Sequence, residues 1–263
     1  MTVDVAISQT AGAAVGTLAR REASRILRHP VYLVLLVYFM VIAGLEGSAS
    51  GFQERDLVRE VASTLGLLWI GPATFFAANL VASSARRAHA ESQLAAAPTT
   101  GQARTLATCL GVLGPTAVAA GIAGALWLAE HVGGTMSAAQ GAAELAAIPL
   151  FALGGGLLGV AVAQWLHWRG APLTVMFALI AWVVVVSGRG GLRWTAPWSV
   201  APQYFGDIPP AGSHSWHAGY LLGLGLLAAV AAVLRYPSHR RPLLALGAAI
   251  GIATLAAGWA QLP

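Results

Sequence analysis

The chain has 263 residues, of which 57% are apolar and only 10% are charged. A soluble domain carries about 25% charged residues, so this composition excludes a soluble globular domain and indicates a membrane protein. All fifteen basic residues are arginines, which excludes the phosphate-binding loop of nucleotide hydrolases, because that loop requires a lysine. We therefore expect an all-α, polytopic integral membrane protein that leaves any ATP-driven step to a partner.

An amphipathic helix over residues 15–28 is the first element that the sequence predicts. Apolar side chains at helical spacing form one face: Val15, Leu18, Ala19, Ala23 and Ile26. Arginines fall on the opposite face: Arg20, Arg21, Arg25 and Arg28. A basic amphipathic helix lies in the membrane interface, and Pro30 would end it before the first crossing. Glu22 interrupts the apolar face; it either pairs with Arg25 at i+3 or contacts a partner protein or another helix.

Seven apolar runs follow, and each approaches or exceeds the ~20 residues that cross a bilayer. We place these spans at residues 31–50, 61–85, 105–129, 145–166, 171–188, 217–234 and 243–262. They make residues 31–262 a transmembrane domain that follows a cytoplasmic segment, residues 1–30. Only the first span contains a charged side chain, Glu46. Gly71–Pro72 and Gly114–Pro115 should kink the second and third helices.

The placement of the arginines sets the orientation. If the N-terminus is cytoplasmic, eleven arginines lie on that side: Arg20, Arg21, Arg25, Arg28, Arg86, Arg87, Arg104, Arg169, Arg235, Arg240 and Arg241. Four lie on the other side: Arg55, Arg59, Arg189 and Arg193. Cytoplasmic loops carry the excess of positive charge, so we expect a cytoplasmic N-terminus and, after seven crossings, a C-terminus on the outer side.

The longest predicted cytoplasmic loop, residues 86–104, begins with the segment RRAHAESQLAAAPTT. Residues 86–97 can form three turns of helix, which Pro98 would close. Arg87, Glu91 and Leu94 then fall on one side, at i, i+4 and i+7. By composition alone this loop is a positively charged anchor. A rigid helix between two spans would also transmit movement of a soluble partner to both of them.

Two segments resemble the permease subunits of type-2 ABC transporters: RREASRILRHP before the first span and RRAHAESQLAAAPTTGQAR after the second. In that family an elbow helix precedes the first crossing, and a coupling helix between the second and third crossings docks into the ATPase subunit. The resemblance assigns the elbow to Arg20, Arg21, Glu22, Arg25 and Arg28. It assigns the ATPase contact to Arg86, Arg87, Glu91, Leu94 and Pro98.

The sequence departs from the family pattern in two places. His89 and Ala90 stand where the family usually has glycine and threonine before the loop glutamate. The family usually has six crossings, so the segment after Arg241 is either an additional helix or a re-entrant hairpin that leaves the C-terminus inside.

The resemblance implies a multi-pass permease subunit of an ATP-driven exporter in a bacterial cytoplasmic membrane. We expect it to be no enzyme by itself and to bind no cofactor, with ATP and Mg on a partner ATPase subunit. The other expected partners are a second permease chain and membrane lipids, with no nucleic acid. The alternative function is an ATP-independent membrane scaffold or sensor subunit, in which the arginine loop only anchors the chain.

The remaining candidate residues carry weaker signals. Glu46 could line a substrate path or be solvated at the outer boundary, and Asn79 could line the path or only pack. His214 and His217 with Asp207 make a poor metal site, so no metal is expected. Three Gly-x-x-x-Gly pairs, which begin at Gly155, Gly219 and Gly247, are weak indications of helix contacts. The single cysteine, Cys109, is predicted to be a small buried side chain.

Overall fold

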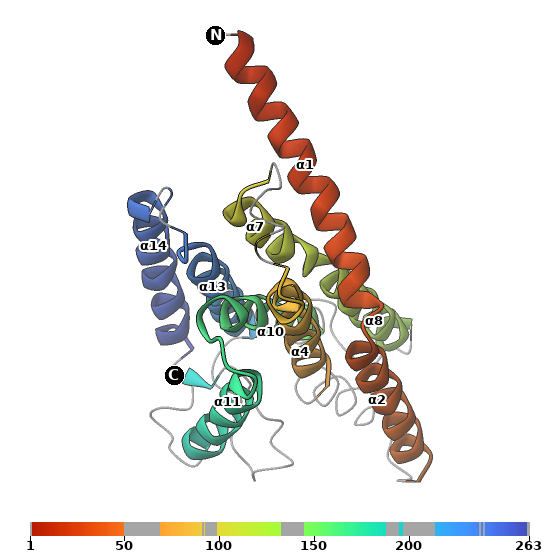
Figure 1. The fold of residues 1–263 in the computed structure, drawn as a ribbon. Helices are drawn as coiled ribbons and strands as arrows, with labels where there is room; N and C mark the ends of the chain where they lie inside the picture. The colour runs from red at the N-terminus through yellow and green to blue at the C-terminus, as the bar shows by residue number, and fades with distance from the viewer. Residues whose placement is uncertain are drawn as a thin grey trace.

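The computed structural model describes residues 2–49, 69–90, 92, 99–132, 145–187, 195–196, 214–236, 238 and 240–261. Within these residues the regular structure is entirely helical (Figure 1). Four stretches are long and apolar enough to cross a membrane: Gly101–Leu128, Ala147–Trp165, Ser215–Val233 and Arg240–Trp259. Two shorter apolar helices cover Gly71–Ala82 and Ala171–Val186. The chain is therefore a helical membrane protein, as the composition predicts.

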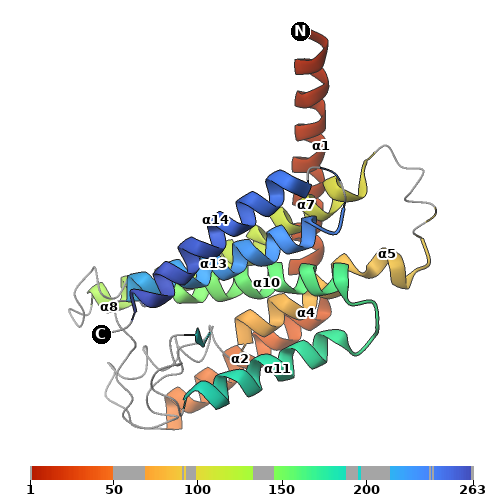
Figure 2. The same ribbon diagram turned by 90° about the vertical axis from the view of Figure 1, so that its left-hand side faces the viewer.

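Helix α1, Thr2–Leu27, begins well before the predicted start at residue 15 and ends one residue before the predicted end. A turn at Arg28 and His29 separates it from α2, Pro30–Ala49, which begins with the proline. Figure 2 shows α1 running crosswise to α10, α13 and α14, and both views show its N-terminal half beyond the bundle (Figures 1 and 2). Ile26, on the predicted apolar face, is completely buried. That face packs against other helices of the same chain.

The most extensive contact among the described helices joins α4, Gly71–Ala82, to α10, Ala147–Trp165. A methyl group added to Gly155 would collide with the carbonyl oxygen of Gly71, and one added to Gly159 with that of Phe75. The absence of side chains at these two glycines lets the backbones approach closely, as in other small-residue helix interfaces. The Gly155/Gly159 pair is thus a true contact, although its sequence signal was weak.

The third predicted span is divided into α7, Gly101–Gly111, and α8, Leu113–Val132. The division at Val112 lies three residues before Pro115, whose ring cannot accommodate the carbonyl group one turn earlier. Helix α1 crosses this break at close range. A Cβ atom at Gly111 would lie 2.9 Å from the Cβ of Glu22, and one at Gly114 would lie 2.9 Å from the Cβ of Ala23. Helix α1 therefore packs against the chain at the kink that Gly114–Pro115 predicted.

The C-terminal part of the chain contains α11, Ala171–Ser187, α13, His214–Val233, and α14, Arg240–Trp259. Helix α13 lies between α10 and α14. The segment after Arg241 is one continuous helix, so the hairpin alternative is wrong. A methyl group at Gly223 would collide with Thr254, whereas Gly251 has open space beside it. Only some of the predicted glycine pairs therefore form contacts.

The largest buried cluster lies where α1, α4, α7 and α10 meet. Its members include Ile26, Ala77, Val81, Cys109, Val112 and Val160. Cys109 is buried within it, as predicted. This cluster joins the crosswise helix to the membrane-spanning bundle and fixes the positions of the polar residues described next.

Candidate functional site

Five segments converge at one end of the bundle, which we call the arginine-rich end. They are the C-terminal half of α1, the short helix α5 (Ser84–Arg87), the start of α7, and the connections after α10 and α13 (Figure 2). The sequence analysis placed the same segments on the cytoplasmic side. Their arginines come from separate parts of the chain, and the fold brings several of them together.

The prediction of a continuous helix over residues 86–97 is wrong at its start. Helix α5 ends at Arg87, and His89 has a positive φ of 53°. A left-handed residue ends a helix, and the amide of Ala90 then donates to the carbonyl of Ala85 at 2.9 Å. Glu91, Leu94 and Pro98 of the predicted contact set lie outside the described residues.

Arg86 and Arg87, which the resemblance assigns to the ATPase contact, donate hydrogen bonds within the chain. Arg86 donates to the carbonyl of Ala163, in the last turn of α10, and Arg87 donates to that of Leu80, in the last turn of α4. Carbonyl groups in the last turn of a helix have no partner within it and attract positive charge. Both arginines therefore cap helix C-termini. Arg86 is half-buried, whereas Arg87 remains exposed.

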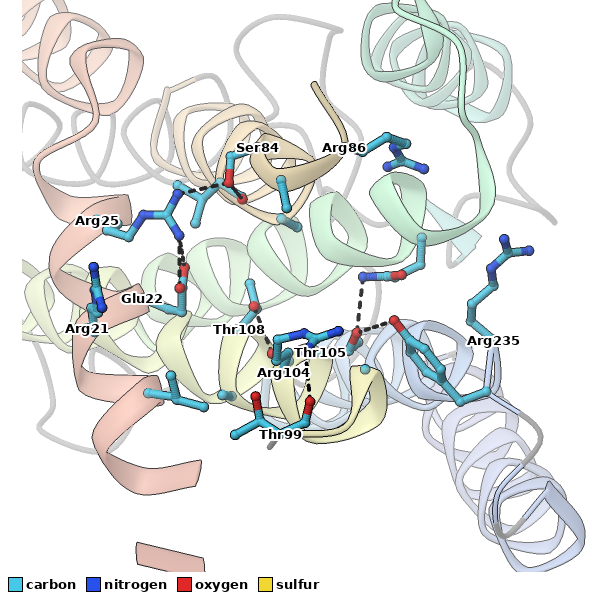
Figure 3. Close-up of a pocket in the computed structure, with 18 of the residues that line it drawn as sticks. Arg21, Glu22, Arg25, Ser84, Arg86, Thr99, Arg104, Thr105, Thr108 and Arg235 are labelled. Carbon is cyan, nitrogen blue, oxygen red and sulfur yellow. Dashed lines mark hydrogen bonds and ion pairs between the residues drawn. The ribbon is translucent and has the colours of Figure 1, made fainter. Parts of the chain in front are cut away.

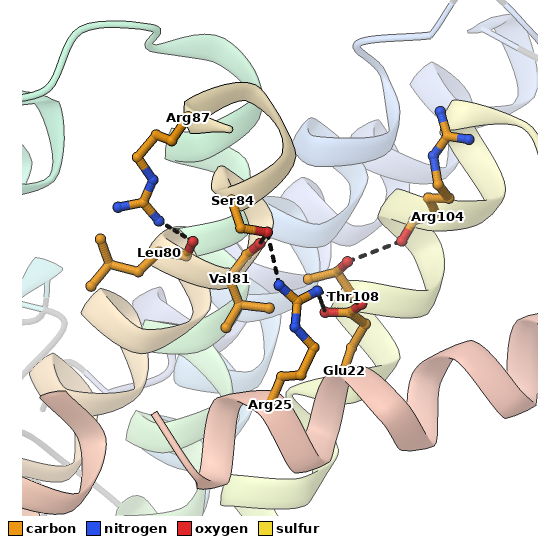
Figure 4. Close-up of polar contacts among 8 residues, drawn as sticks. All are labelled: Glu22, Arg25, Leu80, Val81, Ser84, Arg87, Arg104 and Thr108. Atoms are coloured by element: carbon orange, nitrogen blue, oxygen red, sulfur yellow. Dashed lines mark hydrogen bonds and ion pairs between the residues drawn. The ribbon is translucent and has the colours of Figure 1, made fainter. Parts of the chain in front are cut away.

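A polar bridge connects α1 to the start of α5 (Figure 4). Arg25 forms an ion pair with Glu22 at 2.9 Å, which confirms the predicted i+3 pairing. The same guanidinium group donates to Ser84 Oγ at 2.8 Å, and Ser84 Oγ donates to the carbonyl of Val81 at 2.7 Å. We call the set Glu22, Arg25 and Ser84 the α1–α5 bridge. It links the predicted elbow to Ser84, two residues before the predicted coupling loop.

His29 occupies the corner between α1 and α2, where its Nδ1 accepts a hydrogen bond from the amide of Val31 at 3.3 Å. Burial lowers the pKa of His29 below its ordinary value, and the positive charges of Arg87 and Arg25 lower it further. The corner is thus a cationic region. Arg20 and Arg28, the other predicted elbow arginines, are exposed.

A pocket of about 550 Å³ opens at the arginine-rich end, between α1, α5, α7 and the ends of α10 and α13 (Figure 3). Five arginines line it: Arg21, Arg25, Arg86, Arg104 and Arg235. Glu22 is the only carboxylate among the described lining residues. The described part of the lining therefore has a formal excess of four positive charges.

A chain of hydrogen bonds crosses one wall of this pocket. Gln164 donates to Thr105 Oγ1 at 3.1 Å, and Thr105 donates to the hydroxyl of Tyr236 at 3.3 Å. The Tyr236 ring packs directly on Gly101, where a Cβ atom would meet the ring edge. Thr100 caps the adjoining N-terminus of α7 by accepting from the amide of Ala103 at 3.1 Å. The positive end of α7 therefore faces the same space.

The sequence did not predict this pocket. The sequence places Arg104 and Arg235 as flanking charges on the cytoplasmic side, but nothing in it indicates that these two positions converge. Their only signal is that each borders an apolar span.

Of the two predicted substrate-path residues, only Asn79 has a described side chain. Asn79 is buried between α4 and α10, and its Nδ2 donates to the carbonyl of Gly159 at 3.0 Å. This hydrogen bond supports a packing role for Asn79 rather than a place in the substrate path. Glu46 belongs to α2, but its side chain lies outside the described residues.

The predicted metal candidates are also separate from the arginine-rich end. His217 Nδ1 lies 2.8 Å from Oε1 of Gln261, while Asp207 lies outside the described residues. Within the described part of the chain, no group of three potential metal ligands occurs.

A second cavity, of about 310 Å³, lies within the bundle between α4, α10, α11 and α13. Its lining is largely aliphatic and aromatic and includes Phe75, Phe151, Met176, Trp182 and Leu221. The two cavities thus differ in character, since the first is cationic and the second is apolar.

Comparison with known proteins returned no matching family model, no curated relative and no similar solved structure.

Proposed function

We propose that this chain is the transmembrane permease subunit of an ATP-driven exporter, which forms the substrate path and receives movement from a separate ATPase subunit. The observation that carries the proposal is the α1–α5 bridge. It connects a helix that lies across the bundle to the loop between two bundle helices. Displacing either element at the arginine-rich end would move the other, and with it α4.

The ATPase would bind to the exposed arginine face of α1 and to the loop 86–104. Arg20, Arg21 and Arg28 are exposed on α1. The partner would supply ATP and Mg, because this chain has no lysine for a phosphate-binding loop. Arg86 and Arg87 cap helix C-termini but keep further N–H donors, so they would contact the ATPase together with Glu91, Leu94 and Pro98.

The apolar cavity supports a lipophilic or amphipathic cargo. Its lining offers an alkyl chain or ring the contacts that apolar ligands require. Large apolar side chains are exposed on α2, α11 and α14, among them Val34, Phe177 and Ile252. Lipid would cover part of this surface, and a second permease chain, identical or paralogous, would cover another part and complete the path.

The partner is tested by purifying the tagged chain from its native membranes in mild detergent and assaying bound proteins and ATP hydrolysis. We expect a stoichiometric ATPase, which Glu91→Arg removes or uncouples. Glu130→Arg is the matched control, because it makes the same charge change on the predicted outer side. If no ATPase accompanies the folded chain, the scaffold or sensor function replaces this proposal.

The cargo is tested in liposomes that contain the chain and its ATPase. We expect ATP-dependent movement of an amphipathic substrate, such as a fluorescent lipid, between leaflets. Movement of hydrophilic ions alone would contradict an apolar path.

A further inference from the structure

We propose that the pocket at the arginine-rich end binds a phosphate-bearing anion, either the headgroup of an anionic lipid or a soluble phosphate compound. The inference does not depend on the exporter function, because it rests on the lining of the pocket and is tested on this chain alone. Its basis is an excess of cationic donors around a cavity of ligand size.

The charge of the pocket is the first argument. Arg25 has the ion pair with Glu22, but the described lining supplies no further carboxylate for Arg21, Arg86 and Arg235. Positive charges gathered around one cavity repel one another, and the repulsion is stronger away from bulk water. A ligand with one or two negative charges would remove that repulsion.

The present partners of the arginines are the second argument. Arg86 donates to the carbonyl of Ala163, and Arg104 donates to the carbonyl of Thr99 at 2.7 Å. Arg235 lies 3.3 Å from Nε2 of His167, with its guanidinium 5.9 Å from the centre of the Trp165 ring. The carbonyl of Ala163 and the ring of Trp165 carry no negative charge, so they orient Arg86 and Arg235 without neutralising them. Each guanidinium has five N–H donors, so donors remain for a ligand.

The hydrogen-bond chain on the pocket wall is the third argument. Because Thr105 accepts from Gln164 and donates to Tyr236, the phenolic proton of Tyr236 is left to donate elsewhere. Tyr236 lines the pocket beside the N-terminus of α7. The wall therefore presents a neutral hydroxyl donor and a positive helix end to the same space as the arginines.

A phosphate group matches the hydrogen-bond donors of this pocket better than a carboxylate group does. Phosphate offers several acceptor oxygens and up to two negative charges, and arginine binds it through paired N–H donors. In Figure 3, Arg25 lies on one side of the pocket and Arg86 and Arg235 on the other, with Arg104 between them. Several oxygens on one ligand could reach donors from more than one wall.

The test measures the Tm of the purified full-length chain in neutral detergent by tryptophan fluorescence. The probes are inorganic phosphate and short-chain phosphatidylglycerol, with zwitterionic phosphatidylcholine and sodium chloride of equal ionic strength as controls. At a hundredfold excess over its Kd, a specific ligand should raise Tm by about 5 °C or more. An effect of phosphatidylglycerol alone would identify a lipid site, and an effect of phosphate alone would identify a soluble ligand.

The pocket is tested with the double variant Arg21→Gln/Arg235→Gln, which spares the helix cap Arg86. The matched control is Arg240→Gln/Arg241→Gln, which removes the same charge at the start of α14, outside the pocket. We expect the pocket variant to weaken binding at least tenfold and the control to leave it unchanged. If both variants lost the same amount of binding affinity, the effect would come from the general surface charge, and the proposal would be overturned.

A gentler variant covers the case in which the double variant does not fold. Tyr236→Phe keeps the ring on Gly101 but removes the hydroxyl donor, and it should weaken binding between about twofold and tenfold. The proposal is overturned if neither phosphate nor phosphatidylglycerol raises the Tm of the unmodified chain above the sodium chloride control.

Discussion

The contact between α4 and α10 and the arginine-rich end are stabilised in opposite ways. In the first, glycine backbones touch carbonyl groups of the neighbouring helix, and most of α4 is buried. In the second, long charged side chains span the space between helices and remain partly exposed; the side chain of Arg25 is 43% exposed. One contact depends on the absence of side-chain volume, and the other depends on side-chain donors.

Because of this difference, we expect the contact between α4 and α10 to be rigid and the arginine-rich end to be able to bind a ligand. Close backbone contact leaves no room for a ligand and no group that can rearrange, so α4 and α10 should behave as one rigid unit. At the arginine-rich end, a guanidinium group can exchange a carbonyl partner for an anion without movement of the backbone. The predictions below test whether the two regions respond differently to substitution.

The largest effect should come from Gly159→Ala. The added methyl group would meet the carbonyl oxygen of Phe75 and lie 3.2 Å from the amide nitrogen of Asn79, both of which are backbone atoms that cannot move aside. We expect a destabilisation of about 3 kcal/mol or more, measured by unfolding in mixed micelles. Gly251→Ala is the control, because that glycine faces open space. It should be neutral or stabilising by up to ~1 kcal/mol, and equal effects would contradict the comparison.

Asn79→Leu tests how much of the same contact is polar. The change keeps the approximate volume but removes the hydrogen bond to the carbonyl of Gly159. Hydrogen bonds between membrane helices contribute about 0.6–1.7 kcal/mol, so the same unfolding assay should show a loss in that range. A loss as large as that of Gly159→Ala would mean that the hydrogen bond, rather than close packing, dominates the contact.

Variants of the α1–α5 bridge should have a smaller effect on stability. The coupling energy between Arg25→Gln and Ser84→Ala should be below about 1 kcal/mol, because the guanidinium group is partly exposed. A double-mutant cycle in the unfolding assay measures it. Under the proposed function, the double variant should nevertheless reduce substrate-stimulated ATP hydrolysis by the bound partner. Unchanged stimulation would exclude the bridge from coupling.

The smallest effect concerns the protonation of His29. Its pKa in the folded state lies below the ordinary value of 6.5, so the unfolded chain takes up the proton first as the pH falls. This contribution to stability is complete above pH 6.5 and is lost as the pH falls from there through the folded-state pKa. An NMR titration should show the pKa of His29 rising toward 6.5 in Arg87→Gln. An unchanged pKa would mean that burial alone causes the shift.

Hydropathy predicted the helices of the membrane region well, because each apolar run overlaps a helix and the break at Val112 follows from Pro115. The pairing of Glu22 with Arg25 was also predictable, since both partners lie on one helical turn. These features depend on residues close together in the sequence, for which helical geometry fixes the distances.

The sequence did not predict features that depend on contacts between distant helices. Arg86 and Arg87 were predicted as contacts for a partner, and nothing in the sequence indicated that they also donate to carbonyl groups of α10 and α4. The pocket was missed for the same reason, since its arginines are separated by as many as 214 positions, from Arg21 to Arg235. Periodicity within one helix contains no information about which helix ends meet.

Because Cys109 is buried, cysteines introduced at the arginine-rich end can be labelled selectively. The only thiol of the chain is 6% exposed, within the cluster between α1, α4 and α7. A cysteine introduced on the exposed face of α1 and another at the start of α14 would thus be the only readily modified positions, with no native residue replaced elsewhere. Spin labels or fluorophores at such pairs could follow the separation of the two helices while phosphate or a nucleotide-bound partner is added.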